Sequence, residues 1–570
     1  MCQNKSYVLV LLIFFLSSLA YSQPSFPGAE GFGRNATGGR GGTVIYVTNL
    51  NPTGPGSLTE ALATPGKRYI LFKVSGIIDA VADITYGDVT IAGQTSPKGI
   101  IVRGILVDEI FDTVGTADNI VIRHLRSRPY TTEFRPASSV LDDGLRLDGA
   151  SNVVIDHCSF ANATDEAVQI SNSINISFQN SMMAETIGEH FALGGMLLNY
   201  STPEHPQDSI SIHRNAWMRI GGRFPEISCE SPYASSRPLN LEITHNIFWD
   251  QQAPMLYNPN IDPSAQPPKD SFFLRMNMDD NRSITRNTYS SAMFTHNFLE
   301  YAPNSFFLQN NKMQKWNTFK YSDVDLFYCC NDFSDSAHRP NRDSGVAQLL
   351  PFRHPFPLIS PINFGIRLYI ANNGGAYPRD SMDRRVLAPL IGEVMDLTPV
   401  DSVDYYKDAF VIDYDTALFQ PPIDKDNDGM PDWWEIYHGS DPNTPNHNDL
   451  DLAAKYNIAP AYPNLELYLN KLSDSLITKK NTLLDTASTG VLQEASESMR
   501  VTLRGRLLAA TIDDMGACEM KIIDITGRTL YSVSFASQHL YTLGSQFTAG
   551  VYLVTLRYRD ELVTQKIIIE

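Results

Sequence analysis

Acidic residues near residue 430 alternate with the spacing of a calcium-binding loop. Carboxylates occupy positions one, three, five, nine and twelve of a twelve-residue loop: Asp424, Asp426, Asp428, Asp432 and Glu435. Gly429 stands at position six, where such a loop turns sharply, and Met430 stands at position seven, which contributes a backbone carbonyl oxygen. Calcium takes about six to eight oxygen ligands, so this spacing predicts a calcium site with a structural role. A solvated acidic loop is the alternative interpretation.

A second set of acidic residues recurs in successive segments earlier in the chain. Asp142 and Asp143 precede one segment of alternating apolar residues, and Asp165 and Glu166 follow the next one. In a parallel solenoid, matching positions of adjacent coils lie about 4.8 Å apart, so such carboxylates can converge on one divalent cation or one sugar. Arg223 follows two glycines in a later turn and adds a basic group to the set. Turn residues and surface ion pairs are the alternative reading of these positions.

Short runs of β-type residues recur through the middle of the chain and must position these side chains. The runs are residues 119–125, 152–160, 174–178, 209–213, 241–245 and 283–286. Their period-two alternation predicts strands with one face in a core, and their recurrence every 20 to 45 residues or so predicts stacked coils. Asn215, Asn246 and Asn287 follow three of the runs, and we expect asparagines at equivalent turns to stack. A β-sandwich is the alternative, but two-residue hairpin turns are scarce, which favours a parallel β-helix.

Changes in residue composition and hydrophobic pattern divide the chain into five segments. Residues 1–22 have the pattern of a secretory signal, with Lys5 before the apolar run 8–16 and small residues before Gln23. We expect a β-helix over 23–420, a small calcium-binding segment over 421–472, a polar linker over 473–497 and a β-sandwich over 498–570. After the signal, no segment is apolar enough to span a membrane.

The overall charge constrains the partners. The formal net charge is −18, which argues against nucleic acid, because binding to phosphate backbones requires a basic surface. The same charge repels an anionic polysaccharide, so such a substrate requires a local cation site. The six cysteines include Cys2 in the signal segment, and the odd number left after its removal argues against a disulfide framework.

Several motifs resemble those of polysaccharide lyase family 1, the pectate lyases. The hallmark stretch is similar to residues 152–160 followed by 164–168, and residues 26–33, 90–95 and 375–383 resemble segments of the bacterial members. The resemblance covers roughly residues 26–470. The final segment resembles the sorting domain of the type IX secretion system, which implies a protein secreted from, or attached to the surface of, a Gram-negative bacterium.

The resemblance implies an all-β, right-handed parallel β-helix that cleaves pectate or pectin by calcium-assisted β-elimination. It places catalytic calcium on Asp143 and Asp165, with a further ligand position at Gln169, where a neutral residue stands. It places the catalytic base at Arg223. His190 lies nearest to the position of a lysine of the family and is the second catalytic candidate.

Two further residues carry an expected role in substrate binding. We expect His157 and Glu166, together with Arg223, to contact the polysaccharide. Two other classes remain open. A polygalacturonase-like hydrolase would use Asp142, Asp143 and Asp165 as acid and base, and a non-catalytic carbohydrate-binding surface protein would account for Gln169 and the replaced lysine.

Overall fold

The structure is a computed structural model, and most of the chain after residue 22 is described. The described residues are 23–570 without the following: 109–117, 130–140, 187–193, 203, 229–236, 252, 259–271, 286–292, 296, 316–317, 323–325, 329–346, 363–364, 393–407, 413–419, 480–482, 484–498, 505, 513–517, 525–528, 536–537, 549, 559–560 and 570. They form two compact units, 1–487 and 488–570.

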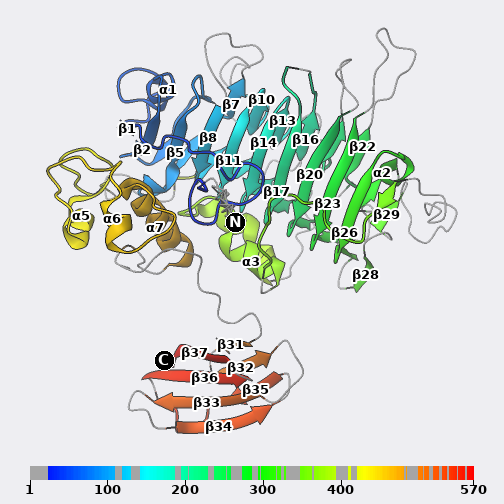
Figure 1. Cartoon of the computed structure of the whole chain (residues 1–570), viewed down its shortest axis with the longest axis vertical. Helices are drawn as coiled ribbons and strands as arrows, with labels where there is room; N and C mark the ends of the chain where they lie inside the picture. Colours follow the sequence, from blue (N-terminus) through cyan, green and yellow to red (C-terminus); the bar gives the residue numbers. More distant parts are fainter. Residues whose placement is uncertain are drawn as a thin grey trace, which may run out of the picture. The chain divides into compact units, whose positions relative to one another are not determined.

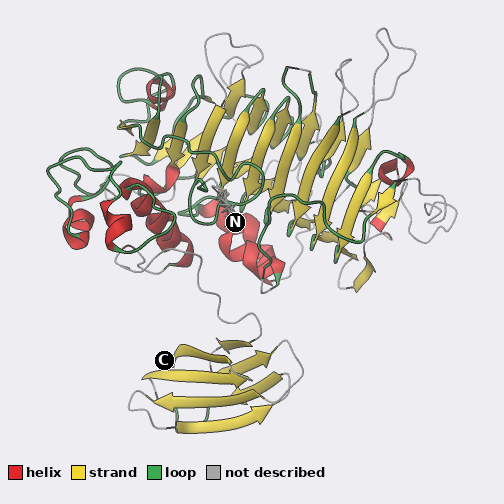
Figure 2. Cartoon of the chain, viewed as in Figure 1, coloured by secondary structure: helices red, strands yellow, loops and turns green. Residues whose placement is uncertain are grey.

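Three parallel sheets wind through the first unit as a β-helix, which confirms the predicted fold class (Figures 1 and 2). Sheet A comprises β1 Thr43–Val47, β2 Arg68–Phe72, β5 Val89–Ala92, β8 Asp118–Arg123, β11 Ser151–Asp156, β14 Ile174–Gln179, β17 Asp208–His213, β20 Pro238–Thr244, β23 Phe273–Asp279, β26 Ser305–Gln309 and β30 Gln348–Leu349. Each strand pairs in parallel with the equivalent strand of the next coil. Parallel connections of this kind are right-handed in nearly all proteins.

The other two sheets complete each coil. Sheet B comprises β3 Gly76–Ile77, β6 Ile100–Val102, β9 Leu125–Ser127, β12 Ser159–Ala161, β15 Met182–Ala184, β18 Ala216–Met218, β21 Ile247–Trp249, β24 Arg282–Thr285, β27 Lys312–Lys315 and the antiparallel β28 Thr318–Ser322. Sheet C comprises β4 Ala82–Asp83, β7 Ile105–Asp108, β10 Leu145–Asp148, β13 Val168–Ser171, β16 Met196–Asn199, β19 Glu226–Ser228 and β22 Leu256–Asn258. A short parallel pair, β25 Phe294–Thr295 with β29 Phe327–Tyr328, lies outside the three sheets.

Alternate residues of the central strands fill the interior of the coils. On sheet C, for example, Leu145 and Leu147 of β10 and Val168 and Ile170 of β13 belong to one continuous buried cluster. The residues between them therefore face outward, because successive side chains of a strand point to opposite faces. This alternation places Gln169 on the outer face of sheet C.

The corner between sheets A and B is built from a repeated turn. Its first residue has a left-handed backbone, with φ of 48–60°, in seven coils: His124, His157, Asn180, Arg214, His245, Asp280 and Asn310. The asparagine ladder lies in the same turns, where Nδ2 of Asn215 donates to Asn246 and Nδ2 of Asn246 donates to Asn281, each at 3.1 Å. The stacking of Asn215 and Asn246 was predicted. Asn287 lies outside the described residues.

Helices and loops cover the outer faces of sheets A and B. The helices α3 Ile366–Asn373 and α4 Ser381–Gly392 pack against sheet B. Residues 26–36 lie on sheet A, where Phe26 packs with Val121 and Val154, and the amide of Gly33 donates to Ser177. The short helices α1 Leu58–Leu62 and α2 Asn297–Glu300 and the 3-10 turn η1 Gly93–Thr95 complete this part.

The predicted calcium segment is helical after its loop. It contains α5 Asp432–His438, α6 Asp451–Lys455 and α7 Asn464–Thr478. The last helix runs six residues into the stretch predicted to be a linker, because its buried face continues through Ser473 onto sheet A, where the Ser473 hydroxyl bonds with Arg123 and His124. The start of the linker at 473 is therefore corrected to after Thr478.

The second unit consists of two antiparallel sheets around a separate core. One sheet has the order β31 Met499–Arg504, β32 Leu507–Ile512, β35 Gln538–Thr542, and the other has the order β34 Thr529–Phe535, β33 Cys518–Asp524, β36 Gly550–Tyr558, β37 Glu561–Ile569. Residues from both sheets, such as Leu508 and Val554, share one buried cluster, which confirms the predicted β-sandwich. Among all described residues, no helix is both long and apolar enough to cross a bilayer.

Candidate functional site

The acidic turn residues and Arg223 lie on successive coils at the corner between sheets B and C. A ladder of backbone hydrogen bonds connects these turns: Gly144 N to Glu166 O at 3.0 Å, Ala167 N to Gly194 O at 2.8 Å, and Gly195 N to Gly222 O at 3.0 Å. Each turn precedes a strand of sheet C, namely β10, β13, β16 and β19. The stacking of coils predicted from the sequence is therefore what aligns these side chains.

Glycine at the third turn allows the coils to approach closely. A Cβ atom at Gly195 would lie 2.0 Å from the carbonyl oxygen of Arg223, a distance that no side chain tolerates. At the same turn, Met196 N donates to the Arg223 oxygen at 2.7 Å. Because Gly195 has no side chain, the turn that carries Arg223 can stack directly on it. This close stacking sets the distance between Arg223 and the acidic turns of the preceding coils.

Three carboxylates converge at this corner. One oxygen from each of Asp143, Asp165 and Glu166 lies within 4.8 Å of the others. Asp143 and Glu166 are buried, whereas the Asp165 side chain is 37% exposed. We refer to these three residues as the corner cluster. Asp165 is its point of contact with solvent.

Two arginines balance the charge of the corner cluster. Arg146, on β10, places Nη2 at 2.6 Å from Oδ2 of Asp143. The guanidinium of Arg223 contacts Glu166, lies 3.6 Å from Oδ1 of Asp165, and donates from Nε to Glu226 at 3.1 Å. Each buried carboxylate therefore has its own cation, and the exposed Asp165 has only a long contact.

Burial dominates the electrostatics of Asp143. Loss of solvation raises the pKa of Asp143 to about 6, the Arg146 guanidinium opposes the rise, and the charges of Asp165 and Asp142 add to it. Three carboxylates this close repel one another, which favours either a proton or a cation between them.

Gln169 lies next to the corner cluster on the outer face of sheet C. It is the register partner of Arg146 on β10 and of Leu197 on β16. Its Nε2 donates to the Ser171 hydroxyl at 2.9 Å. The predicted ligand position at Gln169 is thus one strand away from Arg146, the residue that binds Asp143.

His157 does not lie with these residues. It occupies the left-handed position at the corner between sheets A and B, where its ring stacks on His124 at 5.2 Å and its Nδ1 lies 2.8 Å from Oδ2 of Asp156. Its side chain is 9% exposed. His157 therefore lies at a different corner from the acidic turn residues, and its expected role in substrate binding stays a prediction. His190 lies outside the described residues.

The predicted calcium loop is a second acidic site in the first unit. One oxygen from each of Asp424, Asp426 and Asp428 lies within 4.8 Å of the others, and Glu435 is fully buried. The Asp432 carboxylate pairs with Lys425, whose Nζ lies 2.7 Å from Oδ2, and its role as a ligand stays a prediction.

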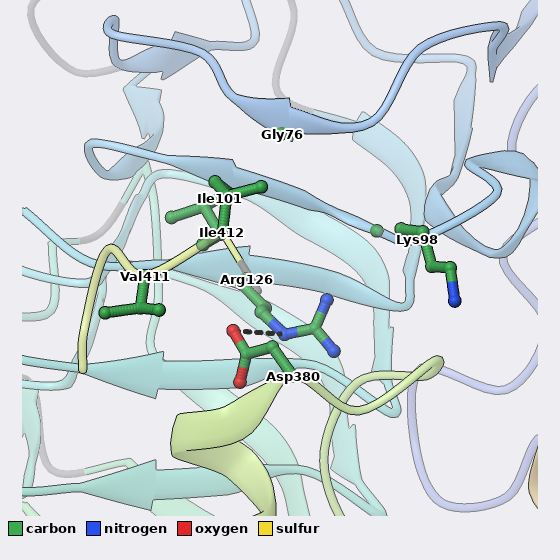
Figure 3. Close-up of a pocket in the computed structure, with 8 residues that line it drawn as sticks. Gly76, Lys98, Ile101, Arg126, Asp380, Val411 and Ile412 are labelled. Carbon is green, nitrogen blue, oxygen red and sulfur yellow. Dashed lines mark ion pairs between the residues drawn. The ribbon is translucent and has the colours of Figure 1, made fainter. Parts of the chain in front are cut away.

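A small cavity is lined by none of the residues of the two acidic sites. Its lining includes Lys98, Ile101, Arg126, Asp380 and Val411, and the ion pair between Arg126 and Asp380 measures 3.4 Å (Figure 3). Arg126 also binds Asp383 at 2.7 Å. These buried ion pairs attach the segment 375–383 to sheet B. We therefore interpret the charged residues that line the cavity as structural.

Two residues of the corner lacked a predicted role. Arg146 and Glu226 stand at outward positions of β10 and β19, and in the sequence they read as ordinary polar residues of alternating strands. The register of sheet C, in which Arg146, Gln169, Leu197 and Glu226 form one row across four strands, is what reveals them.

The chain is similar to known proteins in both units. Residues 505–570 match the family described as secretion system C-terminal sorting domain. "Probable pectate lyase C" of Aspergillus oryzae is 27% identical over 469 residues, which cover 81% of this chain and 96% of that protein. "Probable pectate lyase C" of Aspergillus fumigatus is 33% identical over 219 residues, covering 37% and 48%. "Probable pectate lyase 18" of Arabidopsis thaliana is 30% identical over 206 residues, covering 32% and 48%.

Two solved structures were matched at low similarity. The cedar pollen allergen jun a 1 is 13% identical, with a TM-score of 0.30, over 67% of this chain and 93% of that chain. A pectate lyase from Bacillus sp. N165 in complex with trigalacturonate is 13% identical, with a TM-score of 0.33, over 61% and 99%. By its sequence, then, the chain is similar over most of its length to proteins named pectate lyase, and its last residues match the secretion system C-terminal sorting domain.

Proposed function

We propose that this protein is an exported polysaccharide lyase that cleaves pectate-type polymers by calcium-assisted β-elimination. The observation that carries the proposal is the corner cluster, in which Asp143, Asp165 and Glu166 meet Arg223 at one corner of the β-helix. The sorting domain supports export to the cell surface or beyond. The relatives named pectate lyase support a uronate polymer as the substrate.

The residues at the corner fit calcium. All the candidate ligands are hard oxygen donors, and Asp165 is partly open to solvent. Asp143 and Asp165 would hold the ion, with Gln169 adding a neutral carboxamide oxygen. Bound there, calcium would neutralise a uronate carboxylate and withdraw charge from the carbon beside it.

The arginines bind and orient the substrate in this proposal. The protein carries a net charge of −18, so an anionic polymer needs local positive charge, and Arg146 and Arg223 supply it beside the acidic cluster. Glu166 and Glu226 hold the Arg223 guanidinium in place through direct contacts.

Arg223 is also the proposed base that removes the proton from carbon five of the uronate; the bond from carbon four to the glycosidic oxygen then breaks, a double bond forms between carbons four and five, and the leaving oxygen takes a proton from solvent. A guanidinium normally stays protonated, so it must lose its proton before it can accept another. The contacts with Glu166 and Glu226 stabilise the protonated form. Substrate binding must therefore weaken these contacts before proton transfer. His190 remains the second catalytic candidate.

A product assay tests the proposal. The purified protein is incubated with polygalacturonate, first with calcium and then with a chelator. An unsaturated product that absorbs ultraviolet light, formed only with calcium, is the expected result. Saturated reducing ends would identify a hydrolase instead, and no cleavage of any uronate polymer would leave a carbohydrate-binding protein.

The spacing of the carboxylates bears on the hydrolase alternative. Inverting glycosidases keep their two carboxyl groups about 6.5–9.5 Å apart, to leave room for a water molecule. Oxygens of Asp143 and Asp165 lie within 4.8 Å of each other, which does not favour that geometry. The lyase is accordingly the function that we propose.

A further inference from the structure

The loop that begins at Asp424 contains several buried carboxylate oxygens that have no hydrogen-bond partner. Glu435 of α5 is 0% exposed, and its Oε2 atom has no hydrogen-bond partner. Oδ1 of Asp424 and Oδ2 of Asp426 are also buried without a partner. A buried carboxylate oxygen without a donor or cation is costly, so these three atoms indicate a ligand.

The charges around Glu435 are all of one sign. Burial, followed by the charges of Asp428, Asp426 and Asp424, raises the pKa of Glu435 to about 8. Asn446 Nδ2 donates to Glu435 Oε1 across 3.5 Å, a long contact. Within the described part of the chain, no arginine or lysine forms an ion pair with any of these four carboxylates.

The loop is joined to the first coils of the β-helix by polar contacts. The Tyr46 hydroxyl, on β1, contacts the Asp424 carboxylate. Lys73, which follows β2, donates from Nζ to Asn427 Oδ1 at 3.0 Å and lies 3.7 Å above the centre of the Tyr46 ring. The loop is therefore bound to both of the first two strands of sheet A.

Apolar packing strengthens the same junction. A Cβ atom added to Gly429 would lie 2.9 Å from Leu71 Cδ1, on β2, and 2.8 Å from Leu465 Cδ1, on α7. Met430 and Trp434 share a buried cluster with residues of β2, β5 and α7. In Figure 1, α5, α6 and α7 lie below the strands β1, β2 and β5.

We propose that one calcium ion binds Asp424, Asp426, Asp428, the Met430 carbonyl and Glu435, and that it fastens the α5–α7 segment onto sheet A. This ion is separate from the one proposed at the corner cluster, and it stabilises the fold without taking part in the reaction. The donor set contains only oxygen atoms and no histidine or cysteine, which suits calcium better than zinc or copper. Asp432 closes the loop through Lys425 rather than acting as a direct ligand.

Terbium, which replaces calcium and is excited through nearby tryptophans, reports binding at this loop through Trp433 and Trp434. The full chain is titrated with terbium and, separately, with calcium in a calorimeter. Asp165→Asn removes a ligand of the corner cluster, so its remaining calcium site is the loop. We expect this variant to keep strong terbium emission and one bound calcium.

Substitutions in the loop make the assignment specific. Asp426→Asn and Glu435→Gln are expected to lose the terbium emission and to lower the calcium-dependent midpoint of thermal unfolding by about 3 °C. The matched control is Asp449→Asn, which removes an exposed carboxylate of the same segment. It should bind terbium as the wild type does.

The outcomes separate this proposal from the lyase proposal. If Asp165→Asn binds no calcium, or if Asp426→Asn and Glu435→Gln keep full emission, the loop is not a calcium site. If calcium binds but does not raise the unfolding midpoint of the wild type, the fastening role is wrong. Turnover of polygalacturonate by Asp426→Asn at 20 °C below its midpoint should equal that of the wild type, whatever the loop binds.

Discussion

The two acidic sites of the first unit use the same kind of residue in opposite ways. At the corner cluster the buried Asp143 and Glu166 each have an arginine, and Asp165 is 37% exposed. In the loop, Glu435 is 0% exposed and its Oε2 has no partner. A cluster with its own cations and an open side can exchange ligands, whereas a closed cluster of uncompensated carboxylates suits one permanent ion.

A substitution of Arg223 gives the strongest test of the difference between the two acidic sites. Arg223→Ala should lower kcat by at least about a thousandfold, because it removes both the proposed base and a cation beside the substrate. It should also destabilise the fold by about 3 kcal/mol, since Glu166, 1% exposed, then loses its partner. Turnover and urea unfolding measure the two effects.

A conservative substitution separates catalysis from stability at this position. Arg223→Lys keeps a positive charge near Glu166, so most of the stability should return while turnover stays low. If Arg223→Lys restores both, Arg223 acts only as a charge for Glu166 and not in the reaction.

Asp165 should give a smaller effect on turnover and almost none on the fold. Asp165→Asn is expected to reduce turnover by about a hundredfold at fixed calcium, because it removes the ligand most open to solvent. Its exposed side chain makes only a 3.6 Å ion pair, so the free energy of unfolding should change by less than about 0.5 kcal/mol. A loss of stability as large as that of Glu435→Gln would mean that the two sites do not differ as described.

A substitution at Gln169 is expected to increase the affinity for calcium, whereas the substitutions above reduce activity. Gln169→Asp adds a carboxylate on the row that contains Arg146, and more ligand charge increases calcium affinity. We expect half-maximal turnover at about tenfold less calcium than the wild type requires. Gln169→Glu serves as a control for side-chain length. An unchanged calcium requirement in both variants would mean that the catalytic ion does not bind beside this row.

The sequence predicted the strands and the calcium loop from local patterns alone. Alternation in a run such as 152–160 determines which side chains enter the core, and the spacing from Asp424 to Glu435 determines which can share an ion. Neither depends on how the coils are closed. The C-terminal sandwich was predicted in the same way.

It was harder to predict at which corner of the β-helix each residue lies, because this depends on the length of every coil. His157 lies within the most recognisable motif of the chain, yet that motif turns the backbone from sheet A to sheet B and carries the histidine away from the corner cluster. Arg146 shows the converse case, since only the register of sheet C brings it to Asp143. The segment 375–383 is equally recognisable, and Asp380 and Asp383 serve to bind buried arginines of sheet B.

The last predicted effect concerns acid stability, which has a source outside both acidic sites. His213, on β17, is fully buried with neither ring nitrogen hydrogen-bonded, and burial holds its pKa well below the usual value. Because the unfolded chain takes up this proton near pH 6.5 and the folded chain does not, stability is present above pH 6.5 and falls as the pH drops below it. The expected slope from this group is about 1.4 kcal/mol per pH unit.

The variant His213→Gln tests this prediction, and it introduces a residue that already occurs at the equivalent position of the neighbouring strand. Gln179 of β14 occupies the register position next to His213, so glutamine fits that row. Urea unfolding between pH 7 and pH 5, with excess calcium, should lose stability less steeply in the variant than in the wild type. Equal slopes would assign the acid sensitivity to other groups, among them His124 and His245, whose pKa values burial also lowers.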